Sequence, residues 1–346
     1  MRKLLLLMLL VHTVILPAGA AEITAPGVPE AGAQIMPEET ESFGDGLVQL
    51  LRNGIDRLQP DLRESVRTCV RILTAALLYS LLQILLKQSG KTASMAAVSS
   101  VCLLVFQDTD TLIRMASDTV FEICEYGKLL CPVMTAALAG QGAVSASSGL
   151  YMGTLLFLAL LGALISRFFV PMVYAFLVFS AANSAFEEEY LRKFADSIKS
   201  VLSWLLKTLL LIFTTYMSIT GVVAGTTDAA ALKAAKVTIS TAVPVVGGVL
   251  SDASEAVLVG MGLMKNAAGI YGILAALAIF LGPFLKVGMQ YLSLKLSASL
   301  CSMFAAKNVA SLVNDLSTAL GLLLSMLASA CTMVLISTVC FLKGAA

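Results

Sequence analysis

Residues 318–342 read TALGLLLSMLASACTMVLISTVCFL, a run of 25 residues without a charged side chain. A helix needs about 20 predominantly apolar residues to cross a bilayer, so this run predicts a transmembrane helix. Further apolar runs occupy residues 150–166, 168–183, 203–223, 267–285 and 287–304. The chain of 346 residues is 58% apolar and 13% charged, with a mean hydropathy of +0.90. This composition excludes an ordinary soluble protein and predicts an all-α polytopic membrane protein with roughly six to nine transmembrane helices.

The first 21 residues have the layout of a signal peptide. Two basic residues precede an apolar run at 4–16, which Pro17 ends, and small residues follow at 18–20. The alternative is an uncleaved first transmembrane helix, for which the run is short. We therefore expect cleavage. It would remove His12, the only histidine, and would place the mature N-terminus on the outer face of the membrane.

An acidic segment and an amphipathic helix follow. Residues 22–46 carry six acidic and no basic side chains and are rich in Pro and Gly, which predicts a disordered exported linker. Over residues 47–70, apolar residues recur at three- and four-residue steps opposite an arginine-rich face. This pattern predicts an exported helix that Pro60 kinks or splits. The helix could lie on the bilayer surface, contact a partner or pack on the chain's own membrane domain.

Residues 71–127 are predicted to form a membrane hairpin and an amphipathic segment. Two short apolar runs, 72–86 and 93–106, are joined by a basic turn at 87–91. A basic turn suits the cytoplasmic face under the positive-inside rule. The stretch 107–130 then turns acidic and amphipathic, as expected of a segment that lies outside.

The second half of the chain matches itself at a shift of 119 positions. The shift pairs Gly153 with Gly272, Arg167 with Lys286, Ser180 with Ser299 and Asp196 with Asp315. It predicts two membrane repeats, 128–223 and 240–346, joined by a linker at 224–239; chance similarity between apolar stretches is the alternative. If each repeat crossed the membrane three times, the copies would be inverted, as in many transporters.

Helix-breaking and charged residues gather in the second repeat. They are Pro244, Gly247, Gly248, Asp252, Glu255, Lys265 and Asn266. Proline and paired glycines free backbone groups that need partners at membrane depth, and charged side chains there should avoid lipid. The cluster indicates either a broken helix that lines a polar path or an interfacial loop between two spans. The repeat adds four polar candidates, namely Arg167, Lys286, Asp196 and Asp315.

Other classes of site are disfavoured. Ser89-Gly90-Lys91-Thr92 looks like the end of a phosphate-binding loop, but position 85 is Leu where that loop needs Gly, so we expect no nucleotide. The seven cysteines show no C-x-x-C spacing, and Lys+Arg (23) nearly balance Asp+Glu (22), which argues against a metal site and nucleic-acid binding. A mature chain without histidine excludes imidazole catalysis. An intramembrane aspartyl mechanism would need two acidic residues that converge, and Asp252 and Asp315 form the only pair worth considering. One such pair is weak evidence for catalysis. We therefore expect no enzyme and no cofactor.

Four short motifs carry a family resemblance. They are Ala235-Lys236, the turn Pro244–Gly248, Ser251-Asp252-Ala253, and Lys265–Gly269 with Gly272. This set resembles the signature region of the stage III sporulation protein AE family, and the likeness extends over about 128–342. The resemblance implies a non-enzymatic, multi-pass subunit of the mother-cell-to-forespore channel complex, a feeding-tube or secretion-like assembly required for late forespore gene expression. It implies no catalytic residues.

Two hypotheses about function follow. In the first, the chain is that channel subunit in the mother-cell membrane around the forespore. Its partners are the lipid bilayer and other membrane and ring-forming subunits, which the helix 47–70 would contact in the intermembrane space. In the second, the chain is a free-standing secondary transporter of a small solute. Its polar contacts would then be Asp252, Lys265, Lys286, Asp315 and Arg167.

Overall fold

The computed structural model describes residues 26–37, 43–86, 91–242, 247–303 and 307–343, and every regular element in these ranges is helical. For residues 31, 82–86, 91–94, 222–242, 247–262 and 264 it describes the backbone alone. The predicted signal peptide lies outside the described residues. The elements are α2 (Glu30–Ala33), α3 (Phe43–Asp56), α4 (Leu58–Leu86), α5 (Lys91–Gly140), α6 (Val144–Leu164), the π-helical η1 (Ile165–Phe169), α7 (Val170–Phe186), α8 (Glu189–Ala242), α9 (Gly247–Met303) and α10 (Lys307–Lys343).

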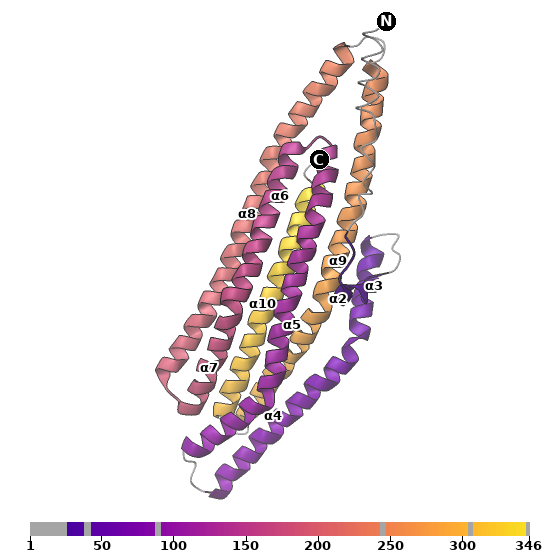
Figure 1. Ribbon diagram of the computed structural model, residues 1–346. Coiled ribbons are helices and arrows are strands. Elements are labelled where there is room, and N and C mark those ends of the chain that lie inside the picture. The colour runs from indigo at the N-terminus through magenta and orange to yellow at the C-terminus, as the bar shows by residue number, and fades with distance from the viewer. Residues whose placement is uncertain (1–25, 38–42, 87–90, 243–246, 304–306, 344–346) are drawn as a thin grey trace.

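The helices α5 to α10 run side by side as an elongated bundle, with α10 inside it (Figure 1). α10 contacts α5, α6, α7, α8 and α9. Its uncharged run 318–342 is mostly buried, and Leu323, Met326 and Ala330 are fully so. A helix that is apolar all round is one that neighbours cover on every side, so this run forms the core of the bundle.

Five helical stretches of the described chain are long and apolar enough to cross a membrane. They are Met95–Gly140, Val144–Phe186, Glu189–Gly221, Lys265–Met303 and Lys307–Lys343. The sequence analysis counted some of these stretches as two runs. The runs 150–166 and 168–183 form one continuous helix through η1, and the run 267–285 and the described part of the run 287–304 both belong to α9.

The join between α6 and α7 keeps its backbone helical around a charged residue and a proline. Pro171 is the second residue of α7 and lies two residues after the end of the π-helical turn Ile165–Phe169. A proline ring clashes with the carbonyl group four residues earlier, here that of Arg167, and lacks an N–H donor. A π-helical turn widens the helix at that point, so the chain continues without a hairpin.

The N-terminal segment packs against α9 through a small apolar cluster. Ile35 and Leu50 are buried against Ala278 and Leu281, and Asn53 Nδ2 donates to the carbonyl oxygen of Ile35 at 3.2 Å. The prediction that 22–46 is a disordered linker is therefore wrong for its described residues. Its few apolar side chains suffice because α9 offers them a surface that is already formed.

The predicted helix 47–70 is divided between α3 and α4. The division falls at Arg57, and Pro60 is the third residue of α4, where a missing N–H costs no helical hydrogen bond. α4 then continues without interruption into the predicted span 72–86. Its buried face includes Ser65, Thr68 and Ile72, so this helix packs on the chain's own bundle.

The shift of 119 positions also matches helix boundaries. It carries the helix 144–186 onto 263–305, whose described part 263–303 includes the whole span Lys265–Met303, and it carries the start of α8 at Glu189 onto residue 308, next to the start of α10 at Lys307. The starts of α8 and α10 lie at the same end of the bundle (Figure 1), so the two helix pairs run in the same direction. Each half contributes two long helices over its described residues. The condition of three spans for an inverted arrangement is therefore not met, while the duplication itself stays a prediction.

Candidate functional site

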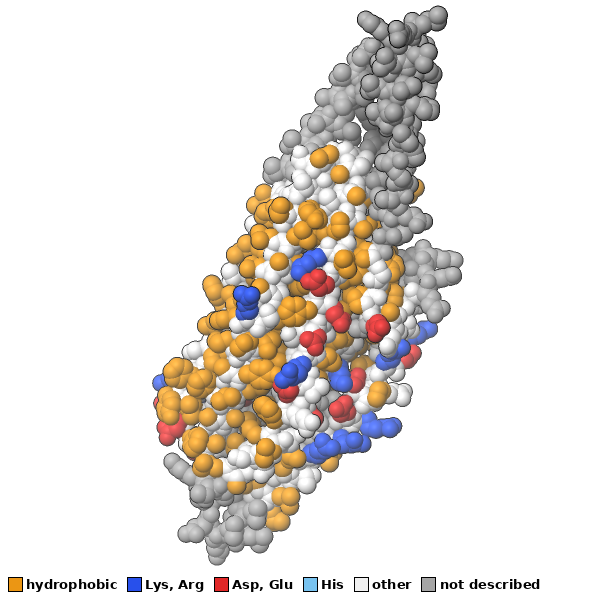
Figure 2. Space-filling view, viewed as in Figure 1, with side chains coloured by type: hydrophobic (Ala, Val, Ile, Leu, Met, Phe, Trp, Pro, Cys, Tyr) orange, Lys and Arg blue, Asp and Glu red, His pale blue; other side chains and the backbone are white. Residues whose placement is uncertain are grey.

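A stripe of polar residues runs along α5. Its members are spaced by three or four residues or lie next to one another, so they share one side of the helix. They are Gln107, Asp110, Thr111, Arg114, Asp118, Glu122, Glu125 and Lys128, and each is exposed or half-buried. Figure 2 shows the charged side chains gathered over α4 and α5, within a surface that is otherwise largely apolar. We call this set the α5 stripe.

The α5 stripe lies beside the apolar middle of the bundle. Leu158 of α6 contacts Gly127 of α5, and its neighbour Phe157 contacts Phe213 of α8 with ring centroids 5.3 Å apart. α6 contains no charged residue, and α8 has none from 208 to 221. The segment 107–130, which was predicted to lie outside the membrane, is thus part of one long helix. It lies at the same depth as the uncharged parts of α6 and α8. Charged side chains there are costly in lipid, so the stripe requires water or a polar partner.

Hydrogen bonds and ion pairs within the described chain involve only some of the charged side chains of the α5 stripe. The pairs are Asp110 with Arg114 at 2.9 Å, Asp110 with the hydroxyl of Tyr174 at 2.5 Å, and Glu125 with Lys128 at 2.7 Å. Asp118 and Glu122 make no hydrogen bond or ion pair with the described residues. The stripe carries four acidic and two basic side chains, a formal charge of −2. Its unpaired part is therefore acidic.

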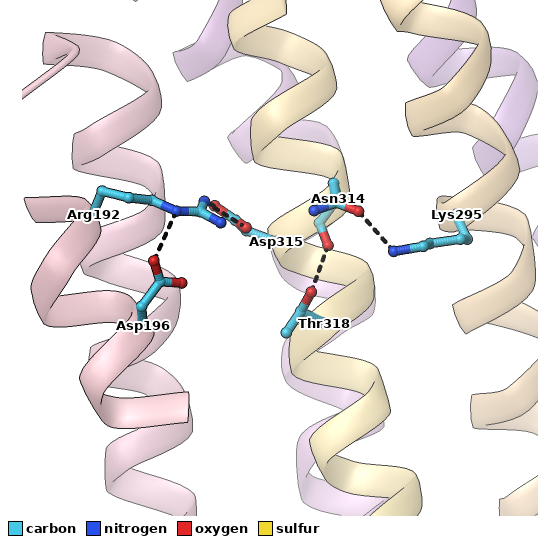
Figure 3. Close-up of polar contacts among 6 residues, drawn as sticks. All are labelled: Arg192, Asp196, Lys295, Asn314, Asp315 and Thr318. Atoms are coloured by element: carbon cyan, nitrogen blue, oxygen red, sulfur yellow. Dashed lines mark hydrogen bonds and ion pairs between the residues drawn. The ribbon is translucent and has the colours of Figure 1, made fainter. Parts of the chain in front are cut away.

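A second polar cluster joins α8 to α10 (Figure 3). Arg192 Nη1 donates to both oxygens of Asp315, at 3.0 and 2.9 Å, and Arg192 Nε donates to Asp196 at 3.2 Å. The side chain of Asp315 is only 4% exposed, whereas that of Asp196 is 53% exposed. Beside it, Lys295 Nζ donates to Asn314 at 2.8 Å. The two aspartates that the shift aligned thus share one arginine.

The other two repeat candidates lie elsewhere. Lys286 Nζ is 3.4 Å from Asp61 Oδ1 and 4.0 Å from Glu64 Oε2, which connects α9 to α4. Arg167 is exposed on η1 and makes no ion pair with the described residues. The four residues therefore do not form one site.

The predicted cluster around the glycine pair is not a broken helix where the structure describes it. Pro244 lies outside the described residues, and Gly247 and Gly248 begin α9, which then runs without interruption to Met303. The side chains of Asp252 and Glu255 are outside the description. Lys265 is buried and Asn266 exposed further along α9. The described members of the cluster thus lie on one continuous helix, and both interpretations of the segment around Pro244 stay predictions.

The carboxylate pair considered for catalysis is not brought together. Continuous helix of about 75 Å separates residue 252 from the end of α9, and Asp315 lies near the start of α10. Asp315 is moreover held by Arg192. The polar residues assigned to a transporter site are dispersed in the same way. Among the described residues, no group of three or more His, Cys, Asp or Glu could hold a metal ion.

Sequence reasoning missed the α5 stripe as a site because hydropathy assigns charged segments to the aqueous side. The signal was present in the spacing of Asp110, Arg114 and Asp118, four residues apart on a helix. Such spacing indicates one polar face on an otherwise apolar helix. A count of charges over a stretch of sequence does not show this face, because it ignores where on the helix each charge lies.

The chain was compared with known proteins. The family model for stage III sporulation protein AE matches residues 39–344. The stage III sporulation protein AE of Bacillus subtilis (strain 168) is 24% identical over 235 residues, which cover 67% of this chain and 59% of that relative. The match therefore spans less than two thirds of the relative's length. No solved structure matches the chain. With five helices able to cross a membrane and a family match over most of its length, this multi-pass membrane protein belongs to the stage III sporulation protein AE family.

Proposed function

We propose that the chain is a non-enzymatic integral subunit of the mother-cell-to-forespore channel complex, in the mother-cell membrane around the forespore. The observation that carries the proposal is the α5 stripe. It spans residues 107–128, about 30 Å of helix, which equals the thickness of the hydrocarbon core. A polar face of that length on an apolar bundle is what a subunit needs where it faces water in a conduit or the polar face of another subunit.

The bundle has apolar faces on α6 and α8 as well as the polar α5 stripe, and a membrane subunit of a complex needs both kinds of surface. Exposed apolar side chains cover α6 and α8, for example Leu156, Leu160, Leu211 and Ile212. These faces suit lipid. The α5 stripe does not, so assembly with other membrane subunits would bring it to a water-filled or protein-lined surface.

The first half of α4 offers a second contact. Leu62, Val66 and Val70 are 55%, 53% and 55% exposed, although the opposite side of the helix is buried against the bundle. Arginines alternate with them at positions 63, 67 and 71. In our proposal this face, which lies level with the start of the α5 stripe, contacts other subunits of the complex.

Neutralising three of the four acids of the α5 stripe tests the conduit face. We expect Asp118→Asn/Glu122→Gln/Glu125→Gln to lower heat-resistant spore counts in the native host by about tenfold or more, because it removes most of the negative charge of the stripe, including that of the unpaired Asp118 and Glu122. Uncharged amides are cheaper than carboxylates in lipid, so the variant should reach the membrane at the wild-type level. The measurements are spore counts and immunoblots of membrane fractions.

The matched control removes three negative charges from another part of the surface. Glu187→Gln/Glu188→Gln/Glu189→Gln alters the exposed α7–α8 turn and should leave spore counts unchanged. Wild-type sporulation by the α5 variant, at a wild-type membrane level, would contradict the proposal.

Labelling of single cysteines tests the direction of the helix pairs. In a chain without its native cysteines, Glu187→Cys and Lys307→Cys should react with an impermeant maleimide from the same side, because α8 and α10 start at one end of the bundle (Figure 1). Val144→Cys, at the start of α6, should react from the other side. Labelling of 187 and 307 from opposite sides would instead restore the inverted arrangement.

A further inference from the structure

A small polar pocket lies where α4, α5 and α9 meet. Asp61, Glu64, Ser65 and Thr68 of α4, Asp108, Thr111 and Leu112 of α5, and Lys286 and Gln290 of α9 line it. Its volume is about 70 Å³. Water needs roughly 10–15 Å³ of such volume, so the pocket has room for several waters or for one small polar group.

The floor of the pocket contains polar side chains that lack partners. Gln290 is 94% buried, since its exposure is 6%, and its amide makes no hydrogen bond with the described residues. Ser65 is 5% exposed, and no described residue accepts or donates a hydrogen bond at its hydroxyl. Within the described chain these groups have only the space of the pocket to turn to, so water or a ligand in the pocket would complete their hydrogen bonds.

The mouth of the pocket is acidic. Three carboxylates face one cation, Lys286, which lies 3.4 Å from Asp61 and 4.0 Å from Glu64. Asp108 accepts only a long hydrogen bond, 3.4 Å, from Thr68. With all four groups charged the pocket has a formal charge of −2, and the carboxylate of Asp108 has no cationic partner among the described residues.

We propose that this pocket binds an ammonium or guanidinium group. Apart from Lys286, every polar group that lines it has an oxygen able to accept a hydrogen bond, including the carboxylates, the hydroxyls and Gln290 Oε1. The complementary ligand is a cation that carries several N–H donors. Lys286 repels a divalent metal ion more strongly than a singly charged group. A singly charged group with several N–H donors can also share the acceptor oxygens with Lys286. The same chemistry could come from a free small amine or from a basic side chain of a neighbouring subunit.

Equilibrium dialysis of radiolabelled methylammonium against the purified full-length chain in detergent tests the site. We expect saturable binding of about one ion per chain, with competition by methylguanidinium and none by tetramethylammonium, which has no N–H donor. Gln290→Leu should weaken binding about tenfold or more, because it removes one acceptor without changing the charge. Asp108→Asn should weaken it further, since it removes the unpaired carboxylate.

Matched variants outside the pocket separate a lost site from a damaged fold. Gln107→Leu makes the same exchange at an exposed position of α5, and Asp56→Asn removes an exposed carboxylate of α3. Both should bind methylammonium as the wild type does. Absence of saturable binding, or equal binding by Gln290→Leu and Gln107→Leu in monodisperse protein, would overturn the proposal. Because the test uses the purified chain, its failure would leave the proposed channel role untouched.

The source of the group is decided in sporulating cells. If wild-type chain purified from them releases a small amine on denaturation and Gln290→Leu does not, the native ligand is a free amine. If no amine is released and Gln290→Leu, but not Asp56→Asn, loses a co-purifying subunit, the ligand is a basic side chain of that subunit. If neither difference is found, the pocket has no native occupant of this chemistry and the proposal is wrong.

Discussion

Arg192→Met is expected to lower the free energy of unfolding by about 3 kcal/mol, because it removes the cation that holds a buried carboxylate. Asp315 is 4% exposed and accepts from Arg192 through both oxygens (Figure 3). Without the arginine, this carboxylate would remain in the bundle with no basic partner. The value is taken from the low end of the range for buried pairs, since the Arg192 side chain is 41% exposed. Equilibrium unfolding in mixed micelles, followed by circular dichroism, measures it.

Two further variants show whether burial is the cause. Asp196→Asn removes the other partner of Arg192, but that carboxylate is 53% exposed, so the loss should be about 0.5 kcal/mol or less. The double variant Arg192→Met/Asp315→Leu should recover most of the stability, because an apolar pair can replace a buried ion pair without leaving a charge behind. Equal effects of Arg192→Met and Asp196→Asn, or no recovery in the double variant, would show that the pair does not stabilise the bundle.

The sequence predicted the fold class because composition alone is enough to recognise apolar runs that are long enough to cross a membrane. The uncharged run 318–342 became the central helix, as such a run should. The number of helices was less predictable. Hydropathy falls at Arg167 and at Lys286, but a helix ends only where its backbone hydrogen bonds end, and at these two places the bonds continue. The average composition of a short stretch of sequence does not distinguish a π-helical turn from a hairpin.

The candidate sites were harder to predict than the fold. The 119-residue shift singled out Asp196 and Asp315, yet it could not show that Arg192 lies between them, because their helices are brought together only by the packed bundle. The pocket near Gln290 joins the consecutive helices α4 and α5 to α9, which lies far from both in the sequence. The α5 stripe was visible as a pattern, but its depth depends on α6, which packs beside α5, and on α8, which packs on α6.

Close packing of α6 on α8 gives the second large effect. Gly149 and Gly153 form a G-x-x-x-G step, which allows helices in a bilayer to approach closely. The structure places this step within the chain. A Cβ added at Gly149 would lie 2.6 Å from Thr220 Cγ2, and one added at Gly153 would lie 2.1 Å from the ring of Tyr216. Threonine and tyrosine are four residues apart on α8, so the two glycines and the two larger residues fit as matching pairs.

Gly153→Leu is therefore expected to lower the free energy of unfolding by about 3 kcal/mol, the upper end for overpacking. The ring of Tyr216 cannot move aside cheaply, because its hydroxyl donates to the Gly149 carbonyl oxygen at 3.2 Å and its ring contacts Phe157 at 5.9 Å between centroids. Gly153→Ala should give a smaller loss, since one methyl group displaces the ring less than an isobutyl group does. Both are measured by the same unfolding experiment in mixed micelles.

Gly221→Leu is the matched control, because a Cβ added at Gly221 meets nothing within 4 Å and leucine favours helix more than glycine does. Its stability should equal or exceed that of the wild type. A Gly153→Leu variant as stable as Gly221→Leu would show that α6 and α8 do not approach closely at this step. If Gly153→Leu changed the oligomeric state and left unfolding unchanged, the glycines would serve contact between chains. The fit of Tyr216 and Thr220 to both glycines argues that they serve the fold of one chain.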